Sequence, residues 1–309
     1  MVDSQQLPLF GTNDALKLSK RTPLGLAVEP FQQYLRGEGK TDNTIKGFTS
    51  DLHLVCQYLG DDVPIGNLST RDLNHFLEWL EHGRGQPCSR KSYARRVTTM
   101  KVFFKWLKEE KIRGDNPASA IVQRSGPAPL QPILSDHDVN ALLDFTNSVR
   151  LAEKPDARPD LLVRLLLDTG MKKSEAMNLT EDQVNRDPEE PFVTVRHKSR
   201  RNVYKERHIP VDPVWLEVLD EYLEQYKPKD TIFTCTARNL EYILHDMALG
   251  AGVDSKVSFE ILRWTSAVRD YLNGMNMDDL REKMGLSRIS WRETSQKIVK
   301  LAEKQVARQ

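Results

Sequence analysis

The stretch LLLDTGMKKSEAMNL, residues 165–179, decides the fold of the second half of this chain. Its leucines end an apolar segment with helical spacing that begins near residue 158. Thr169–Gly170 follows as a turn, because glycine tolerates the backbone conformation in which many helices end. A second, shorter helix is expected over about 173–178. The stretch therefore predicts two helices joined by a tight turn.

The sequence around this turn predicts further helices and one β-hairpin. Side chains alternate with period two over 192–196 and 203–209, so we expect two strands joined around Lys198–Asn202. Apolar side chains at helical spacing predict the other helices of this part, over about 135–147, 213–226, 236–251, 258–274, 276–284 and 291–306.

The N-terminal part has the pattern of a four-helix bundle. Helices are expected from Ala27, over 45–59, from Leu68 to a break at Gly83, and over 89–110. A polar turn with good N-cap residues precedes the second of these helices.

Two segments outside the helices set the expected domain boundaries. Residues 1–24 have weak periodicity and are expected to form a flexible tail, and 122–133 is rich in Gly and Pro, as a linker is. The fold class is therefore mainly α with a small antiparallel β-sheet, in a helical domain over 25–121 and a second domain over 134–309.

The composition is that of an ordinary soluble protein, with 39% hydrophobic and 29% charged residues. No apolar run approaches the roughly 20 residues that span a bilayer, and the N-terminus does not have the pattern of a signal peptide. Cys56, Cys88 and Cys235 are spaced for neither a disulfide framework nor a zinc site. We expect a cytoplasmic protein with no metal, no cofactor and no membrane partner.

Basic residues gather in two segments, although the net charge is only +1. Residues 84–124 hold eleven Lys or Arg against three acids, and 194–207 hold six against one. Either segment alone could be a solvated surface. One segment in each expected domain better fits a protein that grips a polyanion from two sides.

Three segments, taken in order, resemble the tyrosine recombinase, or phage integrase, family. Residues 165–179 are similar to its Thr-Gly-Leu-Arg-x-Ser-Glu-x-x-x-Leu motif, and 205–211 to its Lys-x-Arg-x-x-Pro-Leu strand. Residues 259–287 resemble its His-x-Leu-Arg-His motif followed by a Leu-Gly-His-Ser box. The resemblance covers about 25–300 and implies a core-binding, SAM-like domain followed by a recombinase catalytic-like domain.

The chemistry of that family sets which residues matter. A tyrosine hydroxyl attacks a DNA phosphodiester and forms a covalent phosphotyrosyl link. Two arginines neutralise the charge on the phosphate, a lysine of the hairpin acts as general acid, and histidines assist proton transfer.

Carried over residue by residue, the resemblance keeps three cations. The first arginine falls on Lys172, which has the charge but lacks the planar fork. The hairpin lysine falls on Lys198, and the second arginine falls on Arg263. Lys172 could instead be a solvated charge at a helix start, and Arg263 could form a partly buried ion pair with Glu260.

The remaining catalytic positions have lost their chemistry. The first histidine falls on Glu260, the later histidine on Leu286, and the nucleophile on or near Ser295. The last tyrosine is Tyr271, and the last histidine is His245. We therefore expect a pseudoenzyme that binds DNA without cutting it, and that is nucleoid-associated if the source is bacterial.

Binding surfaces for duplex DNA remain in this interpretation, in which the two domains close on the duplex as a clamp. Most contacts would reach phosphates and position the protein rather than read sequence. The expected contacts are Lys46, Arg90, Lys91, Arg95, Arg96, Lys101, Lys172, Lys198, Arg200, Arg201 and Arg263.

A divergent strand-transfer enzyme is the first alternative. Ser295, Thr294 or Tyr271 would be its nucleophile. A serine hydroxyl needs a base, and the expected histidines are absent.

A protein-interaction scaffold is the second alternative. The helix over about 292–306 carries Ile298, Leu301 and Val306 as a sparse apolar face. This face could dock on a second copy or on a related recombinase, or it could pack on its own domain.

Overall fold

The computed structural model describes residues 18–86, 88–122, 129–197 and 200–307. The chain divides into two compact units, 1–128 and 129–309, and each unit has its own hydrophobic core. Lys198, expected in the hairpin turn, lies outside the described residues.

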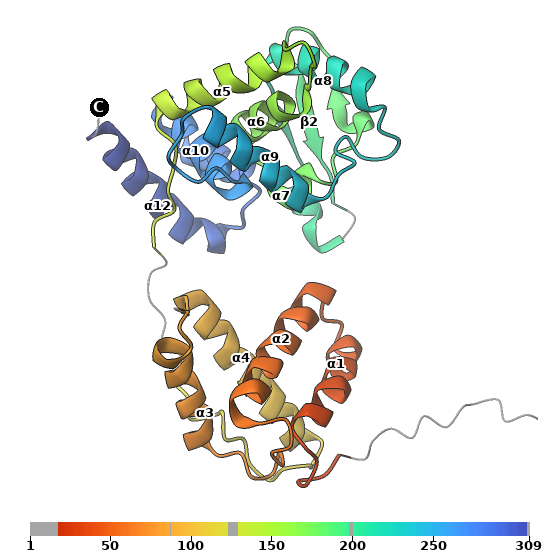
Figure 1. Ribbon diagram of the computed structural model, residues 1–309, viewed down its shortest axis with the longest axis vertical. Helices are drawn as coiled ribbons and strands as arrows, with labels where there is room; N and C mark the ends of the chain where they lie inside the picture. The colour runs from red at the N-terminus through yellow and green to blue at the C-terminus, as the bar shows by residue number, and fades with distance from the viewer. Residues whose placement is uncertain (1–17, 87, 123–128, 198–199, 308–309) are drawn as a thin grey trace, which may run out of the picture. The chain divides into compact units, whose positions relative to one another are not determined.

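The expected helical bundle forms the N-terminal unit (Figure 1). Within the described part of that unit, its α-helices are α1 (Val28–Gly37), α2 (Asp42–Leu59), α3 (Thr70–Glu78) and α4 (Arg90–Glu109). A 3-10 turn, η1 (Gly25–Ala27), precedes α1, and a π-helical turn, η2 (Trp79–Gly83), follows α3. Helices α2, α3 and α4 begin after hydroxyl N-caps, Thr41, Ser69 and Ser89, which accept hydrogen bonds from the first-turn backbone.

Residues 22–24, which the sequence placed in a flexible tail, are instead fixed against the bundle. The Leu24 amide donates to the Val63 carbonyl over 2.9 Å, and the Ile65 amide donates to the Thr22 carbonyl over the same distance. Leu24 is an apolar side chain that the bundle buries completely, which explains why the segment is ordered there.

The C-terminal unit is mostly helical. Helix α6 (Arg158–Thr169) lies at its centre and packs against α5 (Asp136–Arg150), α8 (Pro213–Tyr226), α9 (Ala237–Gly250) and α10 (Phe259–Leu272), and Figure 1 shows α5 and α6 side by side. The short α7 (Lys173–Ala176) follows α6 after one turn, and η3 (Glu181–Gln183) leads into the sheet.

A three-stranded antiparallel sheet is present in the described part of this unit. Its order is β1 (Val184–Asn185), β2 (Phe192–Val195) and β3 (Arg207–Pro210). The expected strand over 203–209 is wrong in its first half, because residues 200–205 form the 3-10 helix η4 (Arg200–Lys205). Val195 pairs with Arg207, so β2 ends where β3 begins and leaves no partner strand for 203–205.

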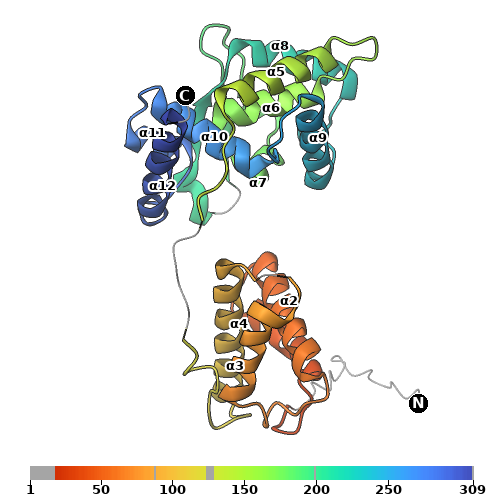
Figure 2. The same ribbon diagram turned by 60° about the vertical axis from the view of Figure 1, so that its left-hand side comes forward.

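The last helices form a small core of their own. Trp264 and Val268 of α10 pack with Leu280 of α11 (Met277–Lys283) and with Ile298 and Leu301 of α12 (Arg288–Val306). Figure 2 shows α11 and α12 beside α10. Ile298 and Leu301 of α12 are therefore used within its own unit, whereas Ile289 and Val306 of the same helix are exposed.

Candidate functional site

The α6–α7 turn positions the first group of the site. Gly170 ends α6 in the left-handed conformation, at φ 54°, and Ser266 of α10 lies close against it. The turn leaves Lys172 immediately before α7, and its backbone amide donates to the Glu175 carboxylate over 2.8 Å. Glu175 thereby caps the helix that carries it, with its carboxylate turned inward.

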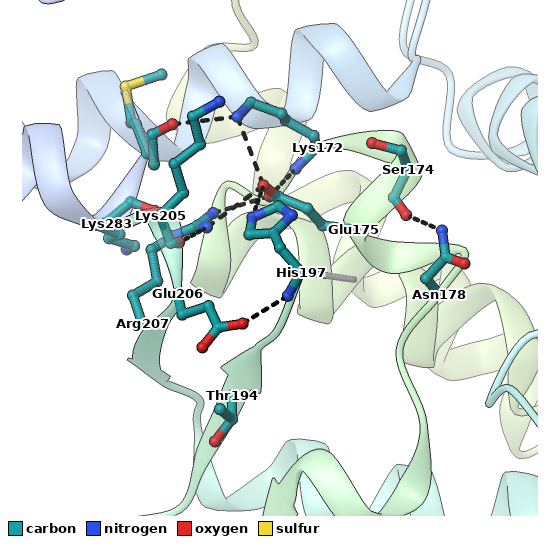
Figure 3. Close-up of polar contacts among 12 residues, drawn as sticks. Lys172, Ser174, Glu175, Asn178, Thr194, His197, Lys205, Glu206, Arg207 and Lys283 are labelled. Atoms are coloured by element: carbon teal, nitrogen blue, oxygen red, sulfur yellow. Dashed lines mark hydrogen bonds and ion pairs between the residues drawn. The ribbon is translucent and has the colours of Figure 1, made fainter. Parts of the chain in front are cut away.

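Glu175 is the centre of the polar site in Figure 3. Its side chain is only 3% exposed, and Arg207 of β3 donates to it over 2.8 Å. The Lys172 ammonium lies 3.5 Å away, and His197 Nε2 lies 3.8 Å away. Burial alone would raise the pKa of Glu175, but the hydrogen bond and charge of Arg207, assisted by Lys172, lower it to about 2.

Four cations bind four successive carbonyls at the C-terminal end of α11. Arg207 Nε donates to the Lys283 carbonyl over 2.7 Å, and Arg263 Nη2 donates to the Met284 carbonyl over 2.6 Å. Lys172 Nζ reaches the Gly285 carbonyl at 3.2 Å, and Arg281 Nη1 reaches the Leu286 carbonyl at 3.4 Å. The partial negative charge at the end of a helix favours cations at this place.

Arg263 is buried between the α6–α7 turn and the α11–α12 turn. The residue is 6% exposed, and its second Nη donates to the Gly170 carbonyl, so it joins the α6–α7 turn to the α11–α12 turn. Burial lowers the pKa of its guanidinium to about 10. The ion pair with Glu260 that the sequence left open is not formed: Arg263 donates to the two carbonyls, and Glu260 accepts from Trp264 Nε1 over 2.9 Å.

Lys172 is the more accessible cation, with 35% of its side chain exposed. Burial lowers the pKa of its ammonium, Glu175 opposes that effect, and the positive charges of Arg263, Arg207 and Lys205 add to it. A phosphate oxygen placed at this ammonium would be favoured, because the surrounding charge is predominantly positive.

Leu286 and Ser295, which the resemblance assigned to two further catalytic positions, make only local contacts in the described structure. Leu286 packs on the small core of α10, α11 and α12. Ser295 lies within α12, and its hydroxyl bonds the Arg292 carbonyl of the same helix over 3.3 Å. The sequence did not predict the contacts of Glu175, His197 and Arg207. Glu175 and Arg207 lie in two of the family-like motifs, 165–179 and 205–211, but the motifs gave them no role.

A second charged cluster ties α4 to α2 in the N-terminal unit. Asp51 is 2% exposed and accepts from Arg95 over 2.7 and 3.0 Å and from Thr99 over 3.0 Å. Arg96 lies 3.5 Å from the same carboxylate. Arg95 keeps 47% of its side chain exposed, whereas Arg96 is largely buried. Both arginines therefore hold the bundle together, whatever else they contact.

The other expected contacts of this unit lie on its surface. Lys46, Arg90 and Lys91 are exposed, and Lys101 is half-buried. Arg200 and Arg201 belong to η4 in the C-terminal unit.

Two family descriptions match the chain. "Phage integrase, N-terminal SAM-like domain" matches residues 28–111, and "Phage integrase family" matches residues 132–294, which is more than half of the chain. The chain belongs to the phage integrase family. The turns and cations around Glu175 all lie inside the second match, whereas Ser295 falls one residue beyond it.

Relatives of this integrase-family chain are similar over most of their length. "Tyrosine recombinase XerD" of Listeria innocua is 24% identical over 297 residues, which cover 91% of this chain and 97% of the relative. "Tyrosine recombinase XerD" of Agrobacterium fabrum is 29% identical over 300 residues, which cover 86% and 88%.

Solved structures share the fold. XerH site-specific recombinase bound to a palindromic difH substrate matches with a TM-score of 0.70 and 16% identity, over 94% of this chain and 96% of that one. A lambda integrase dimer bound to a COC' core site matches with a TM-score of 0.69 and 16% identity, over 90% and 77%. These matches confirm the mainly α architecture with a small antiparallel sheet.

In the described ranges, no helix has the length and apolarity to cross a bilayer, and no group of three or more His, Cys, Asp or Glu side chains is placed to hold a metal ion.

Proposed function

We propose that this integrase-family protein binds duplex DNA through phosphate contacts and does not cleave it. The observation that carries the proposal is Ser295. It occupies the position expected for the nucleophile, lies within a continuous helix, and directs its hydroxyl to that helix's own backbone. A hydroxyl without a neighbouring base is a weak nucleophile, and no His follows residue 245 of the sequence.

The state of the second arginine supports the same proposal. Catalysis of phosphoryl transfer needs donors that point at the developing charge on the phosphate. Arg263 instead directs both of its Nη atoms at main-chain carbonyls and is buried. For Arg263 to donate a hydrogen bond to a phosphate, the α11–α12 turn, whose Met284 carbonyl accepts from it, would have to move away.

DNA binding itself is supported by family membership and by the cations that remain accessible. In the clamp that we propose, the start of α4 contacts phosphates from one side, and Lys172, Lys198, Arg200 and Arg201 of the second domain contact them from the other. Lambda integrase has been solved as a dimer bound to a COC' core site and as a tetramer bound to a Holliday junction, and a second copy of this chain is a corresponding proposed partner.

The chain is expected to form no covalent complex with DNA. Duplexes that bind the chain would first be selected from a random-sequence pool and prepared in nicked or suicide form. The chain would then be incubated with them and denatured, and a protein–DNA adduct that survives denaturation would be sought. A tyrosine recombinase on its own duplex is the positive control. A reproducible adduct that disappears on Ser295→Ala or Tyr271→Phe would establish the divergent enzyme instead.

The pair Arg90→Ala and Lys91→Ala is expected to weaken DNA binding and to flatten its salt dependence. Both side chains are exposed at the start of α4, and each lost phosphate contact removes about 0.9 from the slope of log K against log salt. This pair tests DNA contact more cleanly than Arg95 and Arg96, because loss of those two arginines would also leave the buried Asp51 carboxylate without a cationic partner.

Lys105→Ala with Lys108→Ala is the matched control, since it removes the same charge from the exposed surface of the same helix. These lysines lie roughly 25 Å from the start of α4, at about 1.5 Å per residue. Equal losses for both pairs would mean that binding follows net charge and that the start of α4 has no special role.

A further inference from the structure

The cations around Glu175 differ in how far they can reach a ligand. Arg207 and Arg263 have side chains that are almost fully enclosed, and their guanidinium groups bond to carbonyls on two sides. Lys172 makes longer contacts, 3.2 Å to Gly285 and 3.5 Å to Glu175, and it is partly exposed. An ammonium held by long contacts can exchange a carbonyl for a phosphate oxygen with little rearrangement.

Arg207 occupies its place with a tight fit. Its Nη2 donates to Glu175 over 2.8 Å, its Nε donates to Lys283, and its Nη1 donates to the Lys205 carbonyl over 2.9 Å. Gly285 passes directly over it, so that a Cβ at Gly285 would lie 2.7 Å from Arg207 Nη1. The planar guanidinium can donate to these three partners at once, whereas the single ammonium of a lysine cannot.

Glu175 would behave differently without Arg207. Its buried carboxylate would then need another cation, because an unpaired buried charge is strongly unfavourable. Lys172, at 3.5 Å, is closer than His197, at 3.8 Å. The ammonium would be drawn onto the carboxylate and away from the surface.

We propose that Arg207 is a positioning residue for DNA binding: by saturating Glu175, it leaves the Lys172 ammonium free to bind a DNA phosphate. Arg207 itself does not touch the DNA. This inference rests on the proposed DNA-binding function, and it names the cation of this site that meets the phosphate.

A double-mutant cycle on the full chain tests the proposal, with a fluorescent random-sequence duplex as the probe and salt titration as the readout. Lys172→Ala should lower the salt slope by about one phosphate contact. Arg207→Gln should lower it by the same amount, and the double variant should be no worse than either single variant. A merely structural role would change thermal stability without producing this non-additivity.

Rescue by a second substitution shows whether Arg207 acts through Glu175. Glu175→Gln in the Arg207→Gln background removes the carboxylate that would capture Lys172, so the slope should return toward that of the wild type. This variant leaves neither position 175 nor position 207 with an unpaired buried charge, and it remains informative if Arg207→Gln alone fails to fold.

Three results would overturn the proposal. Additive losses would mean that Arg207 binds a phosphate itself, and an unchanged slope in Arg207→Gln would mean that it does not control Lys172. An unchanged salt slope in Lys172→Ala would mean that Lys172 does not contact a phosphate, although the chain still binds DNA. Failure of the proposed function is distinct from all of these, because the wild-type chain would then not bind the duplex.

Discussion

Glu175→Ala is expected to lower the free energy of unfolding by about 3–5 kcal/mol, the usual result of removing one partner from a buried charge network. The substitution deletes the acceptor for Arg207 and for the Lys172 amide, and it leaves an enclosed guanidinium without its carboxylate. It also removes the residue that caps α7. Urea unfolding at pH 7, followed by circular dichroism, measures the change.

Glu181→Ala is the matched control for this variant. Glu181 also pairs with an arginine, Arg186, at 3.3 Å, but 60% of its side chain is exposed. Its loss should change stability by less than about 1 kcal/mol, as exposed ion pairs do. Similar effects of the two substitutions would contradict the central role of the buried carboxylate.

The same carboxylate should make the C-terminal unit sensitive to acid. Because the pKa of Glu175 falls from 4.5 to about 2 on folding, its contribution is complete above pH 4.5 and is lost as the pH falls through 2. The difference corresponds to about 3 kcal/mol. The gap in unfolding free energy between the wild type and Glu175→Gln should therefore narrow between pH 5 and pH 2, and a constant gap would refute the assigned cause.

Asp51→Ala is expected to cost about 2–3 kcal/mol in the N-terminal unit. The carboxylate is buried and accepts from Arg95 and Thr99, and Arg96 lies beside it. The expected cost is smaller than at Glu175, because Arg95 can turn into solvent when its partner is lost. Thermal unfolding of the full chain, with the two units followed separately by hydrogen exchange, locates the effect.

Thr99→Val is the graded control for Asp51. It keeps the shape of the side chain and removes one hydrogen bond to the carboxylate, so about 1 kcal/mol should be lost. If Asp51→Ala cost no more than Thr99→Val, the arginines would contribute nothing to the link between α2 and α4.

These two clusters change how the basic segments of the sequence are interpreted. A count of charges treats every Lys and Arg of 84–124 and 194–207 as available to a polyanion. In the structure, Arg95 and Arg96 meet Asp51, and Arg207 meets Glu175. The surface available to a phosphate is therefore smaller than the count suggests, and it depends on residues such as Lys46, Arg90 and Lys91.

The sequence by itself determined the helices, the bundle and the family. Apolar spacing and N-cap hydroxyls are local signals, and they located α8 at 213–226 and the turn at Gly170, because a helix needs only its own residues to form its hydrogen bonds. That no tyrosine follows Tyr271 and no histidine follows His245 is likewise visible in the sequence alone.

Only the tertiary structure decided what the remaining charges do. The strand expected over 203–209 was shortened because strand pairing depends on a partner segment, and β2 ends at Val195. Arg263 was assigned either to DNA or to Glu260, yet it binds two main-chain carbonyls that lie 93 and 21 residues away along the sequence. A guanidinium is satisfied by whatever acceptors folding brings within about 3 Å, and their distance along the sequence gives no sign of them.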